Sequence, residues 1–345
     1  MQCKRYTTSV IMDQINIKEY LNQLFRHEIL DKGQAREIMA AIGKGQVEPH
    51  QTTALLTCYQ MRQITSAELS GFREAMIDLA HHIDFSDLET IDIVGTGGDG
   101  KNTFNISTLS SFLVAGAGYK VAKHGNKGVS SPCGSSNVLE HLGYNFSQDY
   151  ATLRSDIDKG NFCFFHAPYF HPAMKEVMPI RRALKIKTFF NIMGPLLNPS
   201  RPKCQFSGVY SEELVPLYQD VLQDMGCQYG VVYDLAGYDE VSLTGPFRIV
   251  TNELDEVMSP SDLGMKTHRQ SDLHGGETVA EAANIFTEIL NGHGTLAQNE
   301  VVIANAGFAI QRFKPEASIM DCIGEARTAL ESGHAKEKLS LVTYK

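Results

Sequence analysis

The sequence predicts an α/β protein: a small N-terminal all-helical domain plus a larger α/β domain with a central, largely parallel sheet flanked by helices. Up to about residue 85, apolar residues recur at helical spacing. Beyond Ser86, short β-rich runs alternate with helical segments, which is typical of a parallel sheet. We therefore place a helical domain at 1–85, with a later contribution from about 171–200, and the α/β domain at 86–345.

The helical domain is predicted from four amphipathic segments separated by turns. The fourth segment begins with Ser66, a residue type that caps helix starts. Met61, Phe72 and Met76 are expected in the core of this domain. Residues 1–13 are expected to form a poorly ordered lead-in. The expected helices are 17–25, 32–42, 49–61 and 66–82.

In the second domain, short apolar runs predict strands and longer amphipathic runs predict helices. The stretch 258–276, which holds one proline and three glycines, is expected to be a long surface loop. The expected strands are 91–94, 119–123, 161–166, 205–210, 229–234 and 247–250. The expected helices are 107–117, 134–142, 150–159, 171–183, 213–225, 277–291, 299–313 and 319–333.

The composition of the chain argues against several classes of protein. The chain has 345 residues, of which 43% are hydrophobic, and a formal net charge of −9. Without a basic tail or lysine run, binding to nucleic acid is not expected. No apolar run is long enough to predict a membrane span or a signal peptide. The seven cysteines are scattered without a C-x-x-C pair, which indicates reduced thiols in a cytosolic protein.

A glycine loop, residues 95–101, lies between the predicted strand 91–94 and a helix start. Glycines followed by a helix N-terminus favour binding of an anion such as phosphate. A dinucleotide site is not favoured, because the next strand ends in Lys123 and not in an acidic residue. A P-loop is not favoured, because Asn102 stands where a metal-binding hydroxyl is required. Asp99 within the loop suits ribose hydroxyls or a metal ion.

A second polar loop, residues 124–134, follows Lys123 and leads to a helix start at about Ser135. Loops that leave the carboxyl ends of parallel strands meet at one edge of the sheet, where α/β proteins bind ligands. Lys123 offers a positive charge for phosphate, and His124 and Asn126 offer hydrogen-bond donors. This motif alone is equally compatible with a structural turn. Together with the glycine loop, it indicates a phosphate site.

Charged residues near the end of a predicted helix form a third motif. Arg181 and Arg182 close the predicted helix 171–183, and their spacing alone favours a role in complementing the helix dipole. The following segment, 190–199, is punctuated by glycine and prolines, which indicates a hinge or a crossing between domains.

An acidic pair forms the fourth motif. Asp239 and Glu240 follow the predicted strand 229–234, and carboxylates at a strand end suit Mg²⁺. Asp255 and Glu256 form a second such pair. Composition does not choose between the pairs, although the first is better placed because it follows a buried strand.

Five motifs in this order resemble the anthranilate phosphoribosyltransferase family, over about residues 17–335. The resemblance implies transfer of the phosphoribosyl group of phosphoribosyl pyrophosphate to the amino group of anthranilate in tryptophan biosynthesis. The products would be N-(5-phosphoribosyl)anthranilate and pyrophosphate. It also implies a cytoplasmic homodimer joined through the helical domain, with two Mg²⁺ ions per subunit. The motifs are Gly95-Thr96-Gly97-Gly98-Asp99, Asn105-Ile106-Ser107-Thr108, Lys123-His124-Gly125-Asn126, Phe190-Asn191 with Gly194-Pro195 and Asn198-Pro199, and Asp239-Glu240-Val241-Ser242.

The resemblance assigns roles to single residues. No strong acid or base is expected among them. For Arg181, pairing with the anthranilate carboxylate replaces the helix-dipole interpretation. Phosphoribosyl pyrophosphate is expected at Gly95, Gly98, Asp99, Thr103, Asn105, Ser107, Thr108, Lys123 and Ser135. Anthranilate is expected at Gly95, His124, Asn126 and Arg181. Magnesium is expected at Ser107, Asp239 and Glu240.

The second loop departs from the commonest family pattern, because Ser131-Pro132-Cys133 replaces a Gly-Lys-Ser-like run and Asn137 replaces a frequent Asp. We expect these changes to affect the affinity of the loop for its ligand more than the reaction itself. Two alternatives remain. A pyrimidine nucleoside phosphorylase shares the fold class, but Asn105 to Thr108 and the Asp239-Glu240 pair favour a diphosphate substrate with metal. A non-catalytic nucleic-acid-binding relative would need a basic groove, which the net charge of −9 disfavours.

Overall fold

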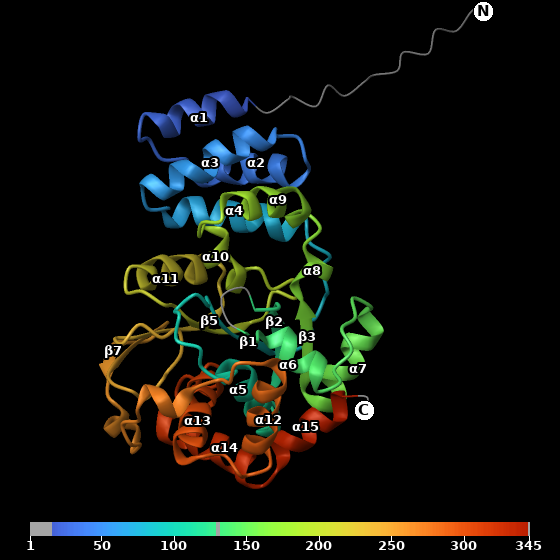
Figure 1. The fold of residues 1–345 in the computed structure, drawn as a ribbon, viewed down its shortest axis with the longest axis vertical. Coiled ribbons are helices and arrows are strands. Elements are labelled where there is room, and N and C mark those ends of the chain that lie inside the picture. The colour runs from blue at the N-terminus through green and yellow to red at the C-terminus, as the bar shows by residue number, and fades with distance from the viewer. Residues whose placement is uncertain (1–15, 129–131, 344–345) are drawn as a thin grey trace, which may run out of the picture.

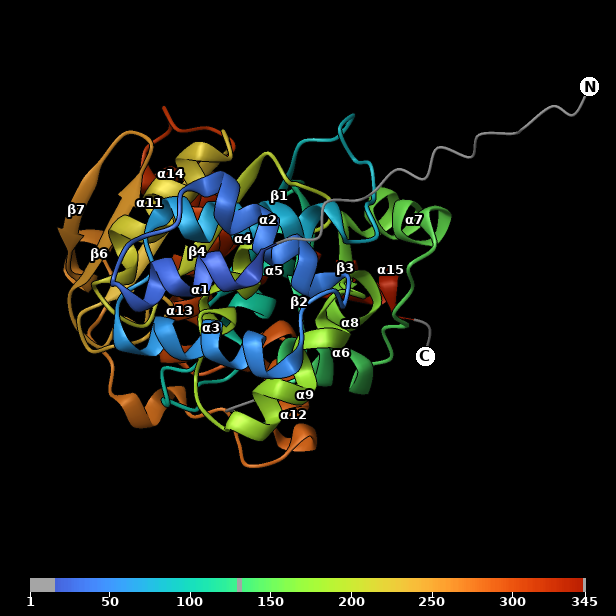
Figure 2. The same cartoon turned by 90° about the horizontal axis from the view of Figure 1, so that it is seen from above.

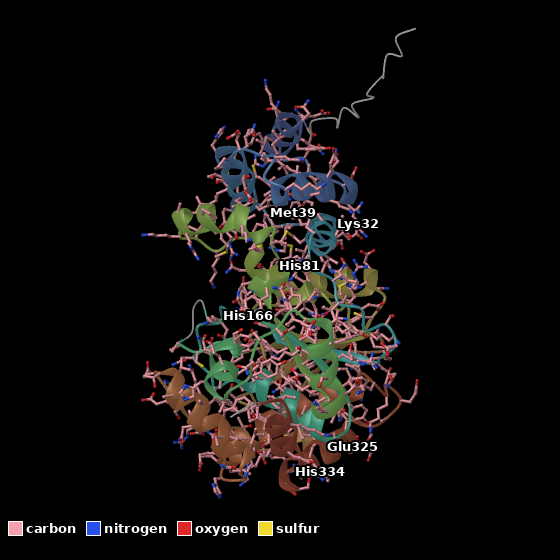
Figure 3. All side chains as sticks on the ribbon, turned by 90° about the vertical axis from the view of Figure 1, so that its right-hand side faces the viewer. Lys32, Met39, His81, His166, Glu325 and His334 are labelled. Carbon is pink, nitrogen blue, oxygen red and sulfur yellow. The ribbon has the colours of Figure 1, made fainter. Side chains whose placement is uncertain are left out.

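The computed structural model describes residues 16–128 and 132–343. The expected lead-in at 1–13 and Ser131 of the second loop lie outside these ranges. A helical domain lies beyond one end of the strands of a central sheet, and further helices pack around the sheet (Figure 1). Figure 3 shows this order along the long axis, with Met39 in the helical domain, His81 at the junction, His166 at the strand ends and His334 at the far end. The predicted fold class is confirmed.

The helical domain is built from four N-terminal helices and one later helix, α9. Phe72 and Met76 are fully buried, as predicted. Met61 was predicted to be in this core, which is wrong: it ends α3 with its side chain 74% exposed. Val177 of α9 packs in the same core, so the later segment completes the domain. The bounds are α1 (Ile17–Phe25), α2 (Lys32–Gly43), α3 (Pro49–Met61), α4 (Ser66–Asp78) and α9 (Met174–Leu184).

A seven-stranded sheet with the order β3-β2-β1-β4-β5-β6-β7 forms the centre of the second domain. Its first five strands are parallel, and both β6 and β7 are antiparallel to their neighbours. The short edge strand β7 was not predicted, because its residues are mostly exposed and lack an apolar run. The strands are β1 (Thr90–Gly95), β2 (Lys120–Gly125), β3 (Phe162–His166), β4 (Cys204–Gly208), β5 (Gln228–Asp234), β6 (Phe247–Thr251) and β7 (Asp255–Met258).

Most predicted helices of this domain are present. The predicted helix 171–183 begins only at Met174, as α9, because His171 and Pro172 lie outside it. The short helices α8 and α10 and the final helix α15 were not predicted. The helices are α5 (Ile106–Gly116), α6 (Ser135–His141), α7 (Tyr150–Gly160), α8 (Ala167–Phe170), α10 (Phe190–Met193), α11 (Leu214–Asp224), α12 (Val279–Leu290), α13 (Leu296–Gln311), α14 (Ile319–Glu331) and α15 (His334–Val342). The expected surface loop at 258–276 contains two short 3-10 helices, η2 (Pro260–Leu263) and η3 (Gln270–Leu273).

The path of the chain creates a switch point in the sheet. After β1, the chain adds β2 and β3 on one side, passes through α9 in the helical domain, and returns as β4 on the other side of β1. Loops that leave β1 and β4 therefore diverge, which leaves room at their carboxyl ends for a ligand. Seen from above, the helical domain lies over the middle of the sheet (Figure 2). No helix within 16–128 and 132–343 is long and apolar enough to cross a membrane.

Candidate active site

The segment 237–242 crosses the switch point between β1 and β4. A β-carbon added to Gly208, the last residue of β4, would overlap the Asp239 backbone carbonyl. A β-carbon on Gly95, at the end of β1, would overlap the Asp239 carboxylate. Only glycine at these two strand ends lets the acidic pair approach the sheet edge this closely.

The acidic pair fixes the glycine loop and the start of α5. The Gly97 N–H donates to Asp239 Oδ2 at 2.6 Å, and the Ser107 N–H donates to Glu240 Oε1 at 3.0 Å. Between these points, Gly97, Gly98 and Gly100 have φ angles of 65°, 79° and 72°. This backbone conformation is readily adopted only by glycine. The pair predicted at a strand end is therefore in contact with the loop predicted to bind phosphate.

The surroundings of three acidic side chains in this site disfavour their ionised forms. Burial, together with Asp99, raises the pKa of Asp239 to about 7. Burial and the neighbouring Asp239 raise the pKa of Glu240 well above its usual value, and burial raises that of Asp99. A cation between these groups would stabilise their ionised forms.

The residues present suit Mg²⁺ at this position. Within 16–128 and 132–343, no three His, Cys, Asp or Glu side chains form a ready-made metal cluster. Magnesium needs no such cluster, because it is usually held by one or two carboxylates, with waters and substrate phosphate oxygens completing its shell. Asp239, Glu240 and Ser107, whose backbone N–H already contacts Glu240, form a set of this kind.

Lys123, in β2, has its ammonium group next to the start of α5. Its Nζ donates to the Ile93 backbone carbonyl and to Ser107 Oγ, the latter at 3.3 Å. Burial lowers the pKa of this lysine to about 8. The side chain therefore brings a positive charge to the end of β1, where the glycine loop begins.

The second loop is connected to the first. Asn105 Nδ2 donates to the Cys133 carbonyl at 3.1 Å, and Ser135 begins α6 beside this contact. The departures from the family pattern have visible consequences in the described part of the loop. Asn137 Oδ1 accepts from the N–H groups of Gly128 and Gly134, at 2.9 and 3.1 Å, and thereby closes the loop. Burial raises the pKa of the Cys133 thiol to about 11, which disfavours its reactive thiolate form.

On the facing helical domain, Arg181 carries a charge without an anionic partner among the described residues. Its Nη2 donates to Asn191 Oδ1 at 3.2 Å, and its guanidinium carbon lies 5.4 Å from the centre of the Phe190 ring. Burial lowers the pKa of this arginine. A half-buried guanidinium without a carboxylate is ready to bind one from a ligand.

Two histidines lie between the sheet edge and the helical domain. His124 and His171 are buried, with ring centres 5.1 Å apart. His124 Nε2 and both ring nitrogens of His171 are buried without a hydrogen bond of good geometry in the described structure, although the Leu197 backbone lies near the His171 ring. Burial lowers the pKa of His124 well below its usual value and that of His171 to about 4, so both rings are neutral near pH 7. Buried polar atoms of this kind can be satisfied by a polar ligand or by water.

His171 was not among the residues predicted for the site. The stretch Tyr169 to Met174 was noted, but its helical spacing concealed the break at His171 and Pro172, where the His171 ring lies beside that of His124.

Three other residues predicted for the site differ in burial and in their contacts. Thr108 is buried in α5, Thr103 pairs with His274 in an isolated bridge, and Asn126 is exposed after β2.

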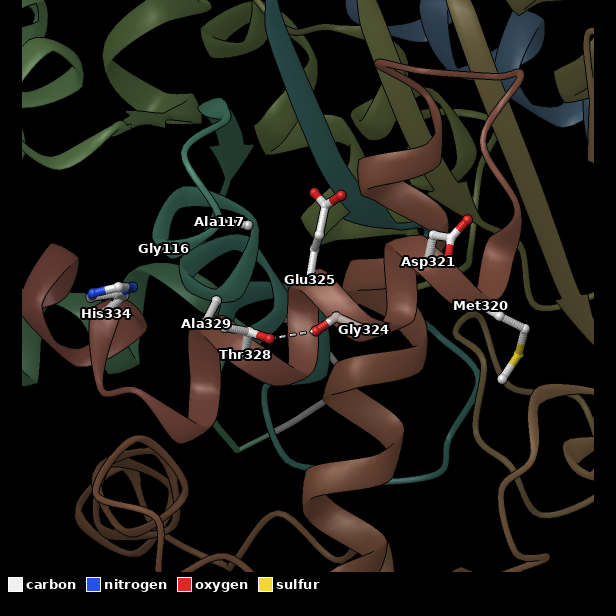
Figure 4. Close-up of a pocket in the computed structure, with 9 residues that line it drawn as sticks. All are labelled: Gly116, Ala117, Met320, Asp321, Gly324, Glu325, Thr328, Ala329 and His334. Atoms are coloured by element: carbon white, nitrogen blue, oxygen red, sulfur yellow. Dashed lines mark hydrogen bonds between the residues drawn. The ribbon is translucent and has the colours of Figure 1, made fainter.

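A separate pocket of about 610 Å³ lies at the C-terminal end of α5, the opposite end from Ser107 (Figure 4). Glu325 in this pocket is already engaged by Lys314 and by the Tyr119 hydroxyl, the latter at 3.0 Å. None of the residues predicted for the site lines it. The pocket is lined by Gly116, Ala117, Met320, Asp321, Gly324, Glu325, Thr328, Ala329 and His334.

Comparison with known proteins agrees with the fold. Residues 87–336 match the model of the glycosyl transferase family a/b domain, and residues 18–80 match its helical bundle domain. The fold and these two matches thus define a glycosyl transferase of this family.

The particular branch of the family follows from its relatives. The anthranilate phosphoribosyltransferase of Cytophaga hutchinsonii is 51% identical over 93% of this chain and 98% of the relative. That of Flavobacterium psychrophilum is 52% identical over 85% of this chain and 89% of the relative. The solved structure of the Thermus thermophilus enzyme has a TM-score of 0.88 at 32% identity, covering 93% of this chain and 97% of the other. The chain belongs to the anthranilate phosphoribosyltransferase family.

Proposed function

We propose that this protein transfers the phosphoribosyl group of phosphoribosyl pyrophosphate to the amino group of anthranilate. The products are N-(5-phosphoribosyl)anthranilate and pyrophosphate. The observation that carries the proposal is the contact of the Asp239-Glu240 pair with the glycine loop and α5, opposite an Arg181 that has no anionic partner in the described structure. Related support comes from the Saccharomyces cerevisiae enzyme, whose structure was solved with PRPP and Mg and has a TM-score of 0.87 at 25% identity, covering 95% of this chain and 96% of that one.

We place phosphoribosyl pyrophosphate, the donor of the phosphoribosyl group, on the loops that leave the sheet. The glycine loop and the start of α5 present backbone N–H groups to phosphate, and Asp99 reaches the ribose hydroxyls. Lys123 brings a buried charge to the same strand end. Ser107, Asp239 and Glu240 would hold Mg²⁺, which supplies neutralisation of the charge that develops on the leaving pyrophosphate. Gly95, Thr103, Asn105, Thr108 and Ser135 complete the proposed donor site.

We place anthranilate, the acceptor, between the two domains. Arg181 pairs with the anthranilate carboxylate and thereby directs the amino group toward the anomeric carbon. His124 is neutral and buried, so it orients the acceptor and adds no charge. Gly95 and Asn126 complete this side. Because aniline nitrogens are weak nucleophiles, positioning carries much of the rate enhancement.

The proposal also covers the number of metal ions, the domain boundaries, the cellular location and the oligomeric state. We place two Mg²⁺ ions in each subunit and assign the domains to 1–85, with a later contribution from about 171–200, and 86–345. We place the protein in the cytoplasm, which accords with the six free cysteines of the described chain. A homodimer through the helical domain accords with the apolar side chains of Phe25, Ile29 and Met61, which are 58%, 58% and 74% exposed there.

One assay tests the proposed reaction. With phosphoribosyl pyrophosphate and Mg²⁺ present, the fluorescence of anthranilate should fall as it is consumed. Phosphorolysis of uridine serves as the control reaction for a nucleoside phosphorylase. Turnover of uridine without consumption of anthranilate would refute the proposal.

A further inference from the structure

The segment 185–189, which joins α9 to α10, contacts the glycine loop through one lysine. Lys187 Nζ donates to the Gly98 backbone carbonyl at 2.9 Å and lies 5.0 Å from the centre of the Tyr210 ring. In the described structure, no other side chain of this segment donates a hydrogen bond to the glycine loop. Lys187 therefore connects the acceptor side of the molecule to the donor side.

Among the described residues, Lys187 is the one side chain outside the glycine loop that hydrogen-bonds the backbone of residues 98–101. The base of the loop is held by Asp239, through the Gly97 N–H. Beyond that point, the Lys101 N–H donates to Asp99 Oδ1 at 3.2 Å, the Asp99 and Asp239 carboxyl groups share a hydrogen bond, and Lys101 Nζ lies 4.8 Å from the centre of the Tyr238 ring. Glycines with positive φ make a backbone easy to rearrange, because they carry no side chain to restrict it. The contact at Gly98 thus restrains the part of the loop with the greatest conformational freedom.

The same segment is tied to the proposed acceptor residue. Asn191 Oδ1 accepts from Arg181 Nη2 at 3.2 Å and from the Thr188 N–H at 2.9 Å. Thr188 follows Lys187 directly. One short stretch of chain therefore holds the guanidinium for the acceptor and the carbonyl at the tip of the donor loop.

We propose that Lys187 is a positioning residue of the transfer reaction: through the Gly98 carbonyl, it holds the glycine loop in the conformation that binds the donor. The inference rests on the proposed function, because it takes the glycine loop as the donor site. Lys187 acts through the loop backbone and not on the reacting atoms.

Three variants test this role. Lys187→Met removes the ammonium group and keeps a side chain of similar length, whereas Lys187→Arg keeps the charge and the N–H donors. Lys185→Met is the matched control, because Lys185 is exposed two residues away and makes no side-chain hydrogen bond or ion pair in the described structure. Each is compared with the wild type by calorimetry with phosphoribosyl pyrophosphate and Mg²⁺, by steady-state kinetics, and by hydrogen exchange of the free protein.

In Lys187→Met, the affinity for the donor should fall by about five- to tenfold, the loss expected for one hydrogen bond. The KM for the donor should rise more than that for anthranilate. Amides of residues 97–101 should exchange faster in the free protein, which a lysine that only touched the bound substrate would not cause. Lys187→Arg should recover most of the affinity, and Lys185→Met should match the wild type.

The inference is overturned if Lys187→Met resembles Lys185→Met in donor affinity, or if its loop exchanges at the wild-type rate. It is also overturned if Lys187→Arg is as weak as Lys187→Met. These outcomes are distinct from a failure of the proposed function, in which the wild-type protein itself would neither bind the donor nor consume anthranilate.

Discussion

Asp239 Oδ2 accepts a hydrogen bond from the Gly97 N–H at 2.6 Å, although the two residues are 142 positions apart in the chain. A carboxylate proposed to hold a metal thus also shapes the loop proposed to hold the donor. Metal binding and loop conformation are therefore linked at this residue, and its amide variant retains one oxygen that accepts the Gly97 bond.

The double variant Asp239→Asn and Glu240→Gln should need a much higher Mg²⁺ concentration for half-maximal turnover. Amides keep the shape of these side chains but lose the negative charge that Mg²⁺ prefers. The fold should persist, because the amide oxygens replace the carboxylate acceptors. Turnover is measured against Mg²⁺ concentration, with Asp255→Asn and Glu256→Gln in β7 as the matched pair. Unchanged magnesium dependence in the first variant would remove its residues from the metal site.

Arg181→Ala should raise the KM for anthranilate far more than the KM for phosphoribosyl pyrophosphate. Loss of a charge-assisted pair costs about 1.5–3 kcal/mol, which corresponds to roughly a ten- to 150-fold change in affinity. Arg182→Ala is the control, because its side chain is exposed on the same helix. Equal increases in both KM values would show that Arg181 has only a structural role.

Gly98→Val should abolish donor binding while the melting temperature stays within a few degrees of the wild type. Gly98 has a φ of 79°, and an added β-carbon would lie 3.3 Å from Lys187 Nζ. Gly118→Val provides a comparison, because Gly118 has a φ of 101° in open space at the turn before β2. Calorimetry with phosphoribosyl pyrophosphate and Mg²⁺ measures the binding. If Gly98→Val binds the donor with wild-type affinity, the glycine loop is only a turn.

Protonation of His171 should make the protein less stable in mild acid. Burial lowers the pKa of His171 from 6.5 to about 4 in the folded chain. Between these values the unfolded chain binds a proton that the folded chain does not, so stability is lost as pH falls through this range. The full effect is roughly 3 kcal/mol. His124, with a pKa lowered in the same direction, adds to it.

His171→Gln should therefore flatten the dependence of the unfolding free energy on pH, measured by urea denaturation at several pH values. His50→Gln, at an exposed position, should leave that dependence as in the wild type. A slope in His171→Gln as steep as in the wild type would mean that the ring is not a source of acid sensitivity.

Local signals explain why much of the fold was predictable from the sequence. β1, the glycine loop and α5 follow one another as an apolar run, a glycine cluster and a second apolar run, and each has the expected structure. The burial of Phe72 and Met76 follows from helical spacing. Met61 lies two residues after the buried Tyr59 and therefore on the opposite side of α3 from the residues that face the core, so helical spacing did not support its predicted burial.

Contacts between distant segments could not be predicted in this way. Nothing near Gly208 in the sequence shows that the Asp239 carbonyl fills the space of its missing side chain. Likewise, the pairing of His171 with His124 depends on how α8 ends, and the contact of Lys187 with Gly98 depends on the fold of two domains. The residue types of the site were therefore visible in the sequence, whereas the arrangement that links them was not.

The passage of the chain through α9 also determines the order in which the protein is assembled during synthesis. The first four helices are complete at Asp78, but Val177, which fills their core, is made only after β1, β2 and β3. A nascent chain therefore carries an incomplete helical bundle while the first three strands of the sheet are translated. For the same reason, a fragment that ends at residue 85 lacks part of its own interior.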